Sequence, residues 1–270
     1  MLEIYLDWNI LSDISSGNLN KFSELVSRKI SDGQLSTFFT DEHIWEASNV
    51  PKDHPRREEF ISSSLETIDE FCPQYFERIK GTSNYRWFIA SSRDVFEQKG
   101  NSINIFQDAL IKSLDDVNFS ELRDTVNNPQ GLTPRHLNNF STDEVIAEIN
   151  RVLDSEEVTE LYRELVEPPI NFSKLLEYSR STDNFFQGLL HQNLRHTHFL
   201  LDSLGFRSDE RSNLGFVGSW MDSEHTSHAS VCDYFITNDE KLKLKSRVVF
   251  DYFCLKTEAL SSDEAINRFV

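Results

Sequence analysis

Two short β-prone runs, far apart in the chain, each end in an aspartate, and this pair constrains the fold more than any other feature. The first run is Leu2–Leu6, and Asp7 follows it directly. The second run is Tyr234–Thr237, and the turn-forming pair Asn238 and Asp239 follows it. If both runs are neighbouring parallel strands, the two aspartates meet at one edge of the sheet. In open α/β sheets, ligands bind in the crevice beyond the carboxyl ends of the strands.

Strands and helices alternate at both ends of the chain. The spacing of apolar residues predicts one or two helices over 10–33, which Asp32-Gly33 would end. Further elements are expected as a strand over 34–39, a helix over 42–47 capped by Thr40-Asp41, a helix over 240–253, a strand over 255–260 and a helix over 262–269. This alternation predicts a three-layer α/β/α fold with a mostly parallel central sheet.

The middle of the chain is predicted to be mostly helical. Helical patterns cover 58–80, 85–98, 102–122, 141–153, 156–166 and 172–204, with a turn-rich loop over 127–134 and Gly205 as the C-cap of the last helix. This segment is too large for a single crossover helix. We therefore expect an α/β core made of 1–50 and 215–270, with 51–214 as a large helical insertion or subdomain.

Composition limits the class of protein. The 270 residues carry a net charge of −18, which disfavours a protein that coats nucleic acid nonspecifically but allows an enzyme with metal ions and a local basic patch. The three cysteines form no Cys-x-x-Cys pair, which argues against a disulfide framework or a structural zinc site and favours a reducing cytosol. Neither a signal-peptide pattern nor an apolar run of ~20 residues is present, so a cytoplasmic protein with no membrane span is expected.

Four carboxylates are candidates for one site: Asp7, Glu46, Asp222 and Asp239. Carboxylates that converge on one crevice raise each other's pKa, and a hard divalent cation such as Mg²⁺ or Mn²⁺ removes that conflict. Simpler interpretations remain open. Asp7 would then only begin a turn, Glu46 would be a solvated helix residue, and Asp239 would be the N-cap of the helix that follows.

The same positions carry a resemblance to a known family. The motifs Leu6-Asp7-x-Asn9, His43-x-x-Glu46, Asp222-x-x-His225 and Thr237-Asn238-Asp239 resemble the signature of PIN-domain, or PIN-like, nucleases. That signature places an acid after the first strand, on the helix after the second strand, at the opening of a later helix and after the next strand. The resemblance covers about residues 1–50 and 215–270. The family's core is smaller than this chain, and the histidines are not part of its signature.

The resemblance implies a metal-dependent hydrolase of phosphodiester bonds. Asp7 and Asp239 would be direct ligands of Mg²⁺ or Mn²⁺, and a metal-bound water would attack the phosphate. Asp222 would be a ligand or a second-site ligand. Glu46 would be a ligand or a base that orients water. RNA is the expected substrate, with single-stranded DNA less favoured, and the chain would be an endoribonuclease acting in RNA processing, as a toxin or as a defence effector.

Other polar residues are expected around this set. The candidates for orienting the carboxylates or touching substrate are Asn9, His43, His225, Thr237 and Asn238. A basic cluster after Asp239 would either grip the nucleic-acid backbone or form a solvated helix face: Lys241, Lys243, Lys245 and Arg247. His228 could belong to a transition-metal site with Asp222 and His225, but a helix-surface or packing histidine is the favoured interpretation. Asp233 is expected to be a turn residue or ion-pair partner at the wrong end of its strand.

Two further functions compete with a nuclease. The first is a non-catalytic PIN-like module that binds nucleic acid or protein, in which the carboxylates structure a cation or an interface. The second is a metal-dependent phosphohydrolase acting on a small nucleotide. The acidic charge also leaves room for a basic protein partner or inhibitor.

Overall fold

The structure, a computed structural model, describes residues 1–78, 85–100, 137–153, 185–207 and 213–270. The chain divides into two compact units. Unit 1 comprises Met1–Asp115, His228–Lys243 and Thr257–Val270, and unit 2 comprises Asp116–Ser227 and Leu244–Lys256. These boundaries differ from the expected division at 50 and 215, because residues after 50 continue the sheet unit.

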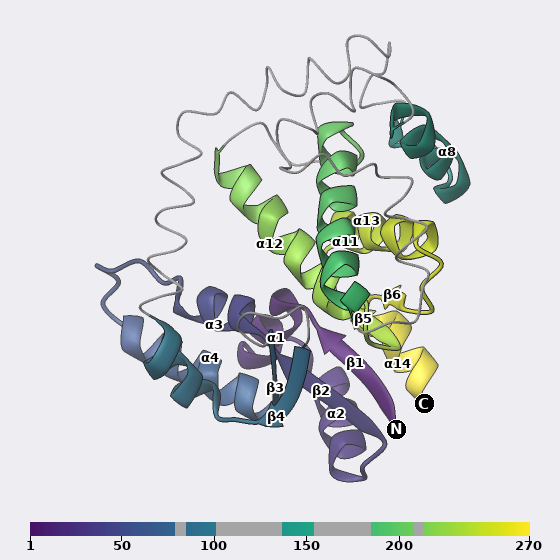
Figure 1. Cartoon of the computed structure of the whole chain (residues 1–270). Coiled ribbons are helices and arrows are strands. Elements are labelled where there is room, and N and C mark those ends of the chain that lie inside the picture. Colours follow the sequence, from purple (N-terminus) through teal and green to yellow (C-terminus); the bar gives the residue numbers. More distant parts are fainter. Residues whose placement is uncertain (79–84, 101–136, 154–184, 208–212) are drawn as a thin grey trace. The chain divides into compact units, whose positions relative to one another are not determined.

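Unit 1 is built on a six-stranded sheet with the strand order β4-β3-β2-β1-β5-β6 (Figure 1). The strands are β1 (Leu2–Leu6), β2 (Leu35–Phe39), β3 (Gln74–Arg78), β4 (Tyr85–Ile89), β5 (Tyr234–Ile236) and β6 (Glu258–Leu260). All neighbouring pairs are parallel except β3 and β4. In the β1–β5 pair, Leu6 lies beside Ile236. The expectation that these strands are parallel neighbours is therefore confirmed, and the chain is a mixed α/β protein with a mostly parallel sheet.

The helices follow the predicted order at both ends of the chain. Unit 1 contains α1 (Trp8–Ser15), α2 (Asn20–Ser31), α3 (Asp41–Ser48), α4 (Arg57–Phe71) and α14 (Ser262–Phe269). Unit 2 contains α8 (Thr142–Leu153) and α11 (Phe185–Ser203), and the helices α12 (Asn213–Ala229) and α13 (Glu240–Tyr252) each have residues in both units. The helices predicted over 10–33, 42–47, 141–153, 240–253 and 262–269 are confirmed.

Three predictions about this chain were wrong in part. The helix expected over 58–80 ends at Phe71, and β3 follows, because Pro73 has no N–H and disfavours helix in the residue before it. The helix expected over 85–98 begins only at residue 92, and the aromatic-rich segment before it forms β4. The strand expected over 255–260 is confined to β6.

The structure bears on only part of the predicted helical middle. The segments 102–122, 127–134, 156–166 and 172–184 lie outside the described residues. The rest of the long helix over 172–204 is confirmed as α11. Gly205 ends it with a positive φ of 83°, its N–H bonded to the Asp202 carbonyl at 3.0 Å.

The two faces of β1 are buried against different groups of side chains. Ile4 and Leu6 belong to one apolar cluster with residues of α1, α2, α3, α4 and α14. Tyr5 points to the opposite face, as the two-residue period of a strand requires. There it belongs to a chain of rings, Trp87–Phe76–Phe38–Tyr5–Phe235, whose successive centroids lie 4.9–5.8 Å apart. Five strands thus each contribute one aromatic ring to this face.

Two further sequence predictions concern membranes and cysteines. None of the helices within the described ranges is long and apolar enough to span a membrane. The three cysteines form no disulfide: Cys72 and Cys232 are buried, as expected of small apolar residues, whereas Cys254 is exposed.

Candidate functional site

Asp7 is a buried carboxylate at the carboxyl end of β1. Its side chain is the N-cap of α1, because Oδ1 accepts the Trp8 N–H at 2.8 Å. Its other oxygen, Oδ2, accepts the Thr237 hydroxyl at 2.7 Å and the Asn9 side-chain amide. With only 4% of its surface exposed, Asp7 is held by donors from both strand ends. The expected role of Asn9 and Thr237 in aiming this carboxylate is consistent with these contacts.

Thr237 links Asp7 to the end of β5. Its hydroxyl donates to Asp7 and accepts the Asp239 N–H at 3.1 Å and the Asn9 amide at 2.9 Å. A hydroxyl has one proton and two lone pairs, so this one is fully used. The arrangement connects Asp7 and the Asp239 backbone through a single side chain.

Asp239 is the N-cap of α13. Its Oδ1 accepts the backbone N–H groups of Lys241 and Leu242 at 2.8 and 3.0 Å. The simpler interpretation of Asp239 as a cap therefore holds, and it is compatible with a position at the same sheet edge as Asp7. Asn238 fixes the turn between Thr237 and Asp239: its N–H donates to Asn9 at 3.1 Å and its side chain accepts the Ser262 N–H at 3.0 Å.

The pKa of the Tyr5 hydroxyl indicates that several acidic groups lie near the end of β1. Burial, followed by the negative charge of Glu42 and then of Asp7 and Glu46, raises the pKa of the Tyr5 hydroxyl well above its usual value. Asp7 and Glu46, both predicted site residues, therefore act on the same phenol. Sequence reasoning missed Glu42, although its spacing four residues before Glu46 places both on one face of α3.

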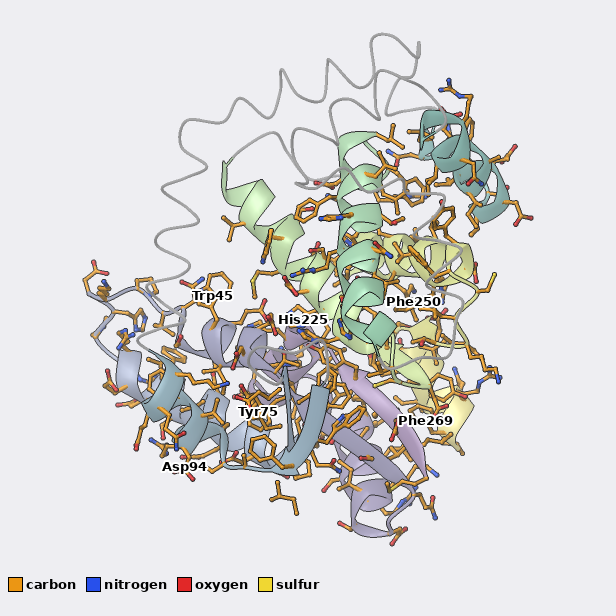
Figure 2. The ribbon with its side chains drawn as sticks, viewed as in Figure 1. Trp45, Tyr75, Asp94, His225, Phe250 and Phe269 are labelled. Carbon is orange, nitrogen blue, oxygen red and sulfur yellow. The ribbon has the colours of Figure 1, made fainter. Side chains whose placement is uncertain are left out.

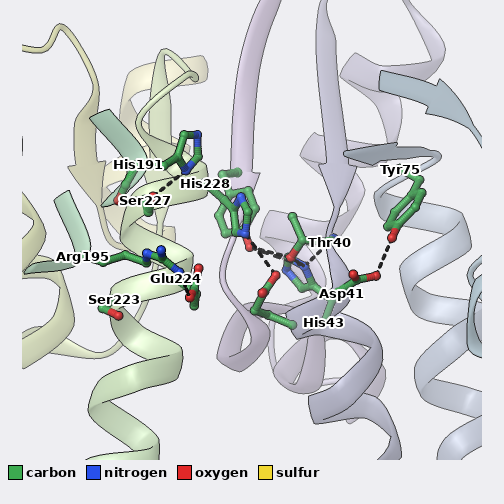
Figure 3. Close-up of polar contacts among 12 residues, drawn as sticks. Thr40, Asp41, His43, Tyr75, His191, Arg195, Ser223, Glu224, Ser227 and His228 are labelled. Atoms are coloured by element: carbon green, nitrogen blue, oxygen red, sulfur yellow. Dashed lines mark hydrogen bonds and ion pairs between the residues drawn. The ribbon is translucent and has the colours of Figure 1, made fainter. Parts of the chain in front are cut away.

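His43 has a structural role and is not at the surface. It is fully buried, and its Nδ1 accepts the Thr40 N–H at 3.1 Å in the capping box of α3 (Figure 3). Its Nε2 lies 2.8 Å from the Leu6 carbonyl oxygen. Both ring nitrogens are therefore engaged with the backbone. The expectation that His43 touches substrate is not favoured, whereas a supporting role behind Asp7 is.

A second polar group begins at the first turn of α3. The Tyr75 hydroxyl donates to Asp41 (Figure 3) and accepts from Lys99 Nζ at 2.6 Å. Burial and the Glu42 charge raise the pKa of Asp41. Glu42 itself lies 3.1 Å from the Nε2 of His228, which packs edge-on against a ring of β3. His228 therefore packs against a ring of the sheet and also contacts a carboxylate.

Asp222 and His225 both belong to unit 2 and to the body of α12. The expectation that Asp222 opens its helix was wrong, because α12 begins at Asn213 and the acid lies well inside it. Its carboxylate is 3.8 Å from Lys245 Nζ, which also lies 3.4 Å from Asp202. His225, which is labelled in Figure 2, is almost completely buried. Within its unit, Asp222 is therefore the partner of a buried lysine.

The basic cluster of α13 is divided between buried and accessible residues. Lys243 is 7% exposed and pairs with Glu240 at 2.8 Å and Glu264 at 3.2 Å. Lys245 is only 1% exposed. A grip on phosphates needs exposed cations, so burial disfavours this role for these two lysines. Lys241 is exposed and Arg247 half-buried, and they remain candidates.

Asp233 lies at the amino end of β5, away from the candidate site. Its side chain accepts the Glu3 N–H at 2.8 Å, and its own N–H donates to the Glu3 carbonyl at 2.8 Å. It therefore joins the amino ends of β5 and β1, opposite the edge that carries Asp7.

The donor chemistry around Asp7 fits a hard cation with few protein ligands. Asp7, Glu46 and Asp239 do not place three carboxylate oxygens within 4.8 Å of one another. A closed all-protein cage is therefore not formed by these three residues. Mg²⁺ keeps several waters and is commonly held by one or two carboxylates, so it does not require three protein ligands here.

Comparisons of this chain with protein-family models, with curated proteins and with solved structures each found no match. The similarity to PIN-domain nucleases therefore rests on the four short motifs.

Proposed function

We propose that this protein is a divalent-metal-dependent nuclease with a PIN-like three-layer fold, carrying a helical insertion, and that its preferred substrate is RNA. The observation that supports this most is the meeting of β1 and β5. Asp7 and Asp239 follow the ends of two adjacent parallel strands, and Thr237 joins the first carboxylate to the backbone of the second. In parallel sheets this edge is the usual place for a ligand.

Each residue has a defined part in the proposal. Asp7 and Asp239 hold Mg²⁺ or Mn²⁺, Glu46 orients the attacking water or completes the ligand set, and Thr237 and Asn9 keep the Asp7 carboxylate in one orientation. A bound ion supplies a polarised phosphate and a water of lowered pKa. Asp222 and His225 are not needed in this scheme. Lys241 and Arg247 are the remaining candidates for contact with the nucleic-acid backbone.

Burial of charge gives the proposal its physical basis. A carboxylate as buried as Asp7, close to a phenol that also feels Glu42 and Glu46, carries an electrostatic cost. Donors from Trp8, Asn9 and Thr237 offset part of this cost. A divalent cation offsets the rest of this cost. Its binding is therefore favoured by the uncompensated negative charge.

A cleavage assay tests the proposal. Purified protein is incubated with single-stranded RNA, structured RNA and single-stranded DNA in Mg²⁺, Mn²⁺ or EDTA. We expect metal-dependent cleavage of RNA, and a loss of at least 100-fold in Asp7→Asn, since removal of a metal ligand removes charge stabilisation worth several kcal/mol. Full activity of Asp7→Asn, or cleavage that persists in EDTA, contradicts it. Binding of RNA without cleavage under any metal favours the non-catalytic module.

A further inference from the structure

The backbone carbonyl group of Leu6, the residue before Asp7, lies beyond the end of the β1–β2 pairing. The register of these strands runs from Leu2 beside Leu35 to Ile4 beside Thr37. The last residues of β2 then pair with β3 instead, with Phe39 beside Tyr75. A buried backbone carbonyl without a strand partner is costly and needs another donor. At Leu6 that donor is the imidazole of His43, at 2.8 Å.

The hydrogen bonds of His43 define its protonation. The Thr40 backbone N–H can only donate, so Nδ1, 3.1 Å away, must accept. The Leu6 carbonyl can only accept, so Nε2 must carry the proton. His43 is therefore a neutral imidazole in the Nε2–H form. It connects the first turn of α3 to the end of β1 while fully buried.

The peptide group between Leu6 and Asp7 is thus held from both sides. Its N–H donates to the Ile236 carbonyl at 2.9 Å, and its carbonyl accepts from His43. We propose that His43 is a positioning residue: it replaces the missing β2 partner, fixes this peptide plane and so sets where the Asp7 carboxylate points. The part of this inference that concerns a cation rests on the proposed function, whereas the part that concerns the peptide does not.

The substitution His43→Gln separates the two bonds. Glutamine is a normal third residue of a capping box, so the Thr40 cap is retained, but its side chain cannot also reach the Leu6 carbonyl. We expect a folded protein in which amide exchange at Asp7 is at least tenfold faster and Mn²⁺ binds about tenfold more weakly, the usual effect of losing a residue that supports a ligand. Ser261→Ala is the control, because it removes a cap from α14 in the same unit.

The outcomes are distinct. Unchanged exchange at Asp7 and unchanged Mn²⁺ affinity in folded His43→Gln overturn the inference. If that variant does not fold, ¹⁵N spectra of the wild-type imidazole decide: a proton on Nε2 supports the inference and a proton on Nδ1 overturns it. If wild-type protein binds no Mn²⁺ and cuts nothing, the proposed function fails, while Asp7 exchange in His43→Gln still tests the positioning of the peptide.

Discussion

At the residue scale, Asp239 illustrates how one side chain serves both folding and a candidate site. Its carboxylate accepts two backbone N–H groups at the start of α13. An aspartate at this position is therefore explained by capping alone, and its presence is not by itself evidence for a metal. Only variants that keep the cap and remove the charge can separate the two roles.

Asparagine and alanine at position 239 make that separation. Asparagine caps helices about as well as aspartate, so Asp239→Asn should leave the free energy of unfolding within about 0.5 kcal/mol of wild type, whereas Asp239→Ala should cost about 1 kcal/mol. Both should lose cleavage if the charge holds a cation. Urea unfolding and cleavage are measured on the same preparations. If Asp239→Asn is active, Asp239 serves only as the N-cap of α13 and not as a cation ligand.

His196 on α11 predicts a dependence of stability on pH. Burial, and then the charge of Arg195, lowers its pKa to about 4 from an ordinary value of 6.5. Its contribution to stability is therefore complete above pH 6.5. It falls as pH drops toward 4, because the unfolded chain binds the proton first.

We expect this loss to be about 2 kcal/mol, since the ring is partly exposed to water. The change in free energy of unfolding between pH 7 and pH 4 should be smaller in His196→Gln than in wild type by that amount. Equal changes in the two proteins would contradict the pKa of about 4.

The residues of the candidate site were predictable to different degrees. Asp7 and Asp239 follow from local pattern, because each ends an apolar run. The bonding of His43 does not, since it depends on how α3 packs against β1, whereas the spacing of Glu42 to Glu46 was a signal that could have been used. The partners of Lys245 could not be predicted either, because Asp202 and Asp222 come from two other helices, α11 and α12.

At the scale of single elements, α13 shows why a row of lysines need not be a binding surface. In the sequence, the alternating lysines of this helix, Lys241, Lys243 and Lys245, indicate a basic surface. In the folded protein, Lys243 and Lys245 turn toward carboxylates of α14, α11 and α12. They hold helices together, and only the remaining basic residues stay accessible.

Replacing the most buried of these lysines should be costly. Lys245→Met removes the cation and leaves Asp202 and Asp222 facing each other's charge. Breaking a buried pair from one side costs about 3 kcal/mol. Adding Asp202→Asn to this variant should recover part of the loss. Urea unfolding measures both, and a loss below about 1 kcal/mol in Lys245→Met would show that the pairs contribute little.

Two predicted helices, over 58–80 and 85–98, were partly wrong for a reason that concerns single elements. The segment after α4 was expected to continue as helix because its apolar residues fit a helical period. Pro73 ends the helix, the aromatic residues of β4 favour a strand, and the pairing of β4 with β3 decides the outcome. Such pairing is a property of two segments together, which a single window of sequence does not reveal.

At the scale of the whole molecule, unit 1 is assembled from three separate stretches of chain. Its sheet is completed only when the last part of the sequence adds β5 and β6 beside β1. The candidate site therefore depends on the complete sheet, and a cation bound there would stabilise contacts between the first and last parts of the chain.

Thermal unfolding with and without metal tests this dependence. A ligand that binds only the folded state adds about 2.7 kcal/mol when present at 100 times its Kd. We expect saturating Mg²⁺ or Mn²⁺ to raise the Tm by several degrees, and EDTA to reverse the increase. Asp7→Asn should show no such increase. A similar rise in wild type and Asp7→Asn would place the ion elsewhere.

The alternation along β1 also has a genetic consequence. Ile4 and Leu6 face the helices of unit 1, Tyr5 faces the chain of aromatic rings, and Asp7 follows at once. Inserting or deleting one codon here would exchange the two faces and carry the carboxylate away from Thr237. Point substitutions among similar apolar residues would preserve both. Selection should therefore act on the length of this segment more strongly than on its composition.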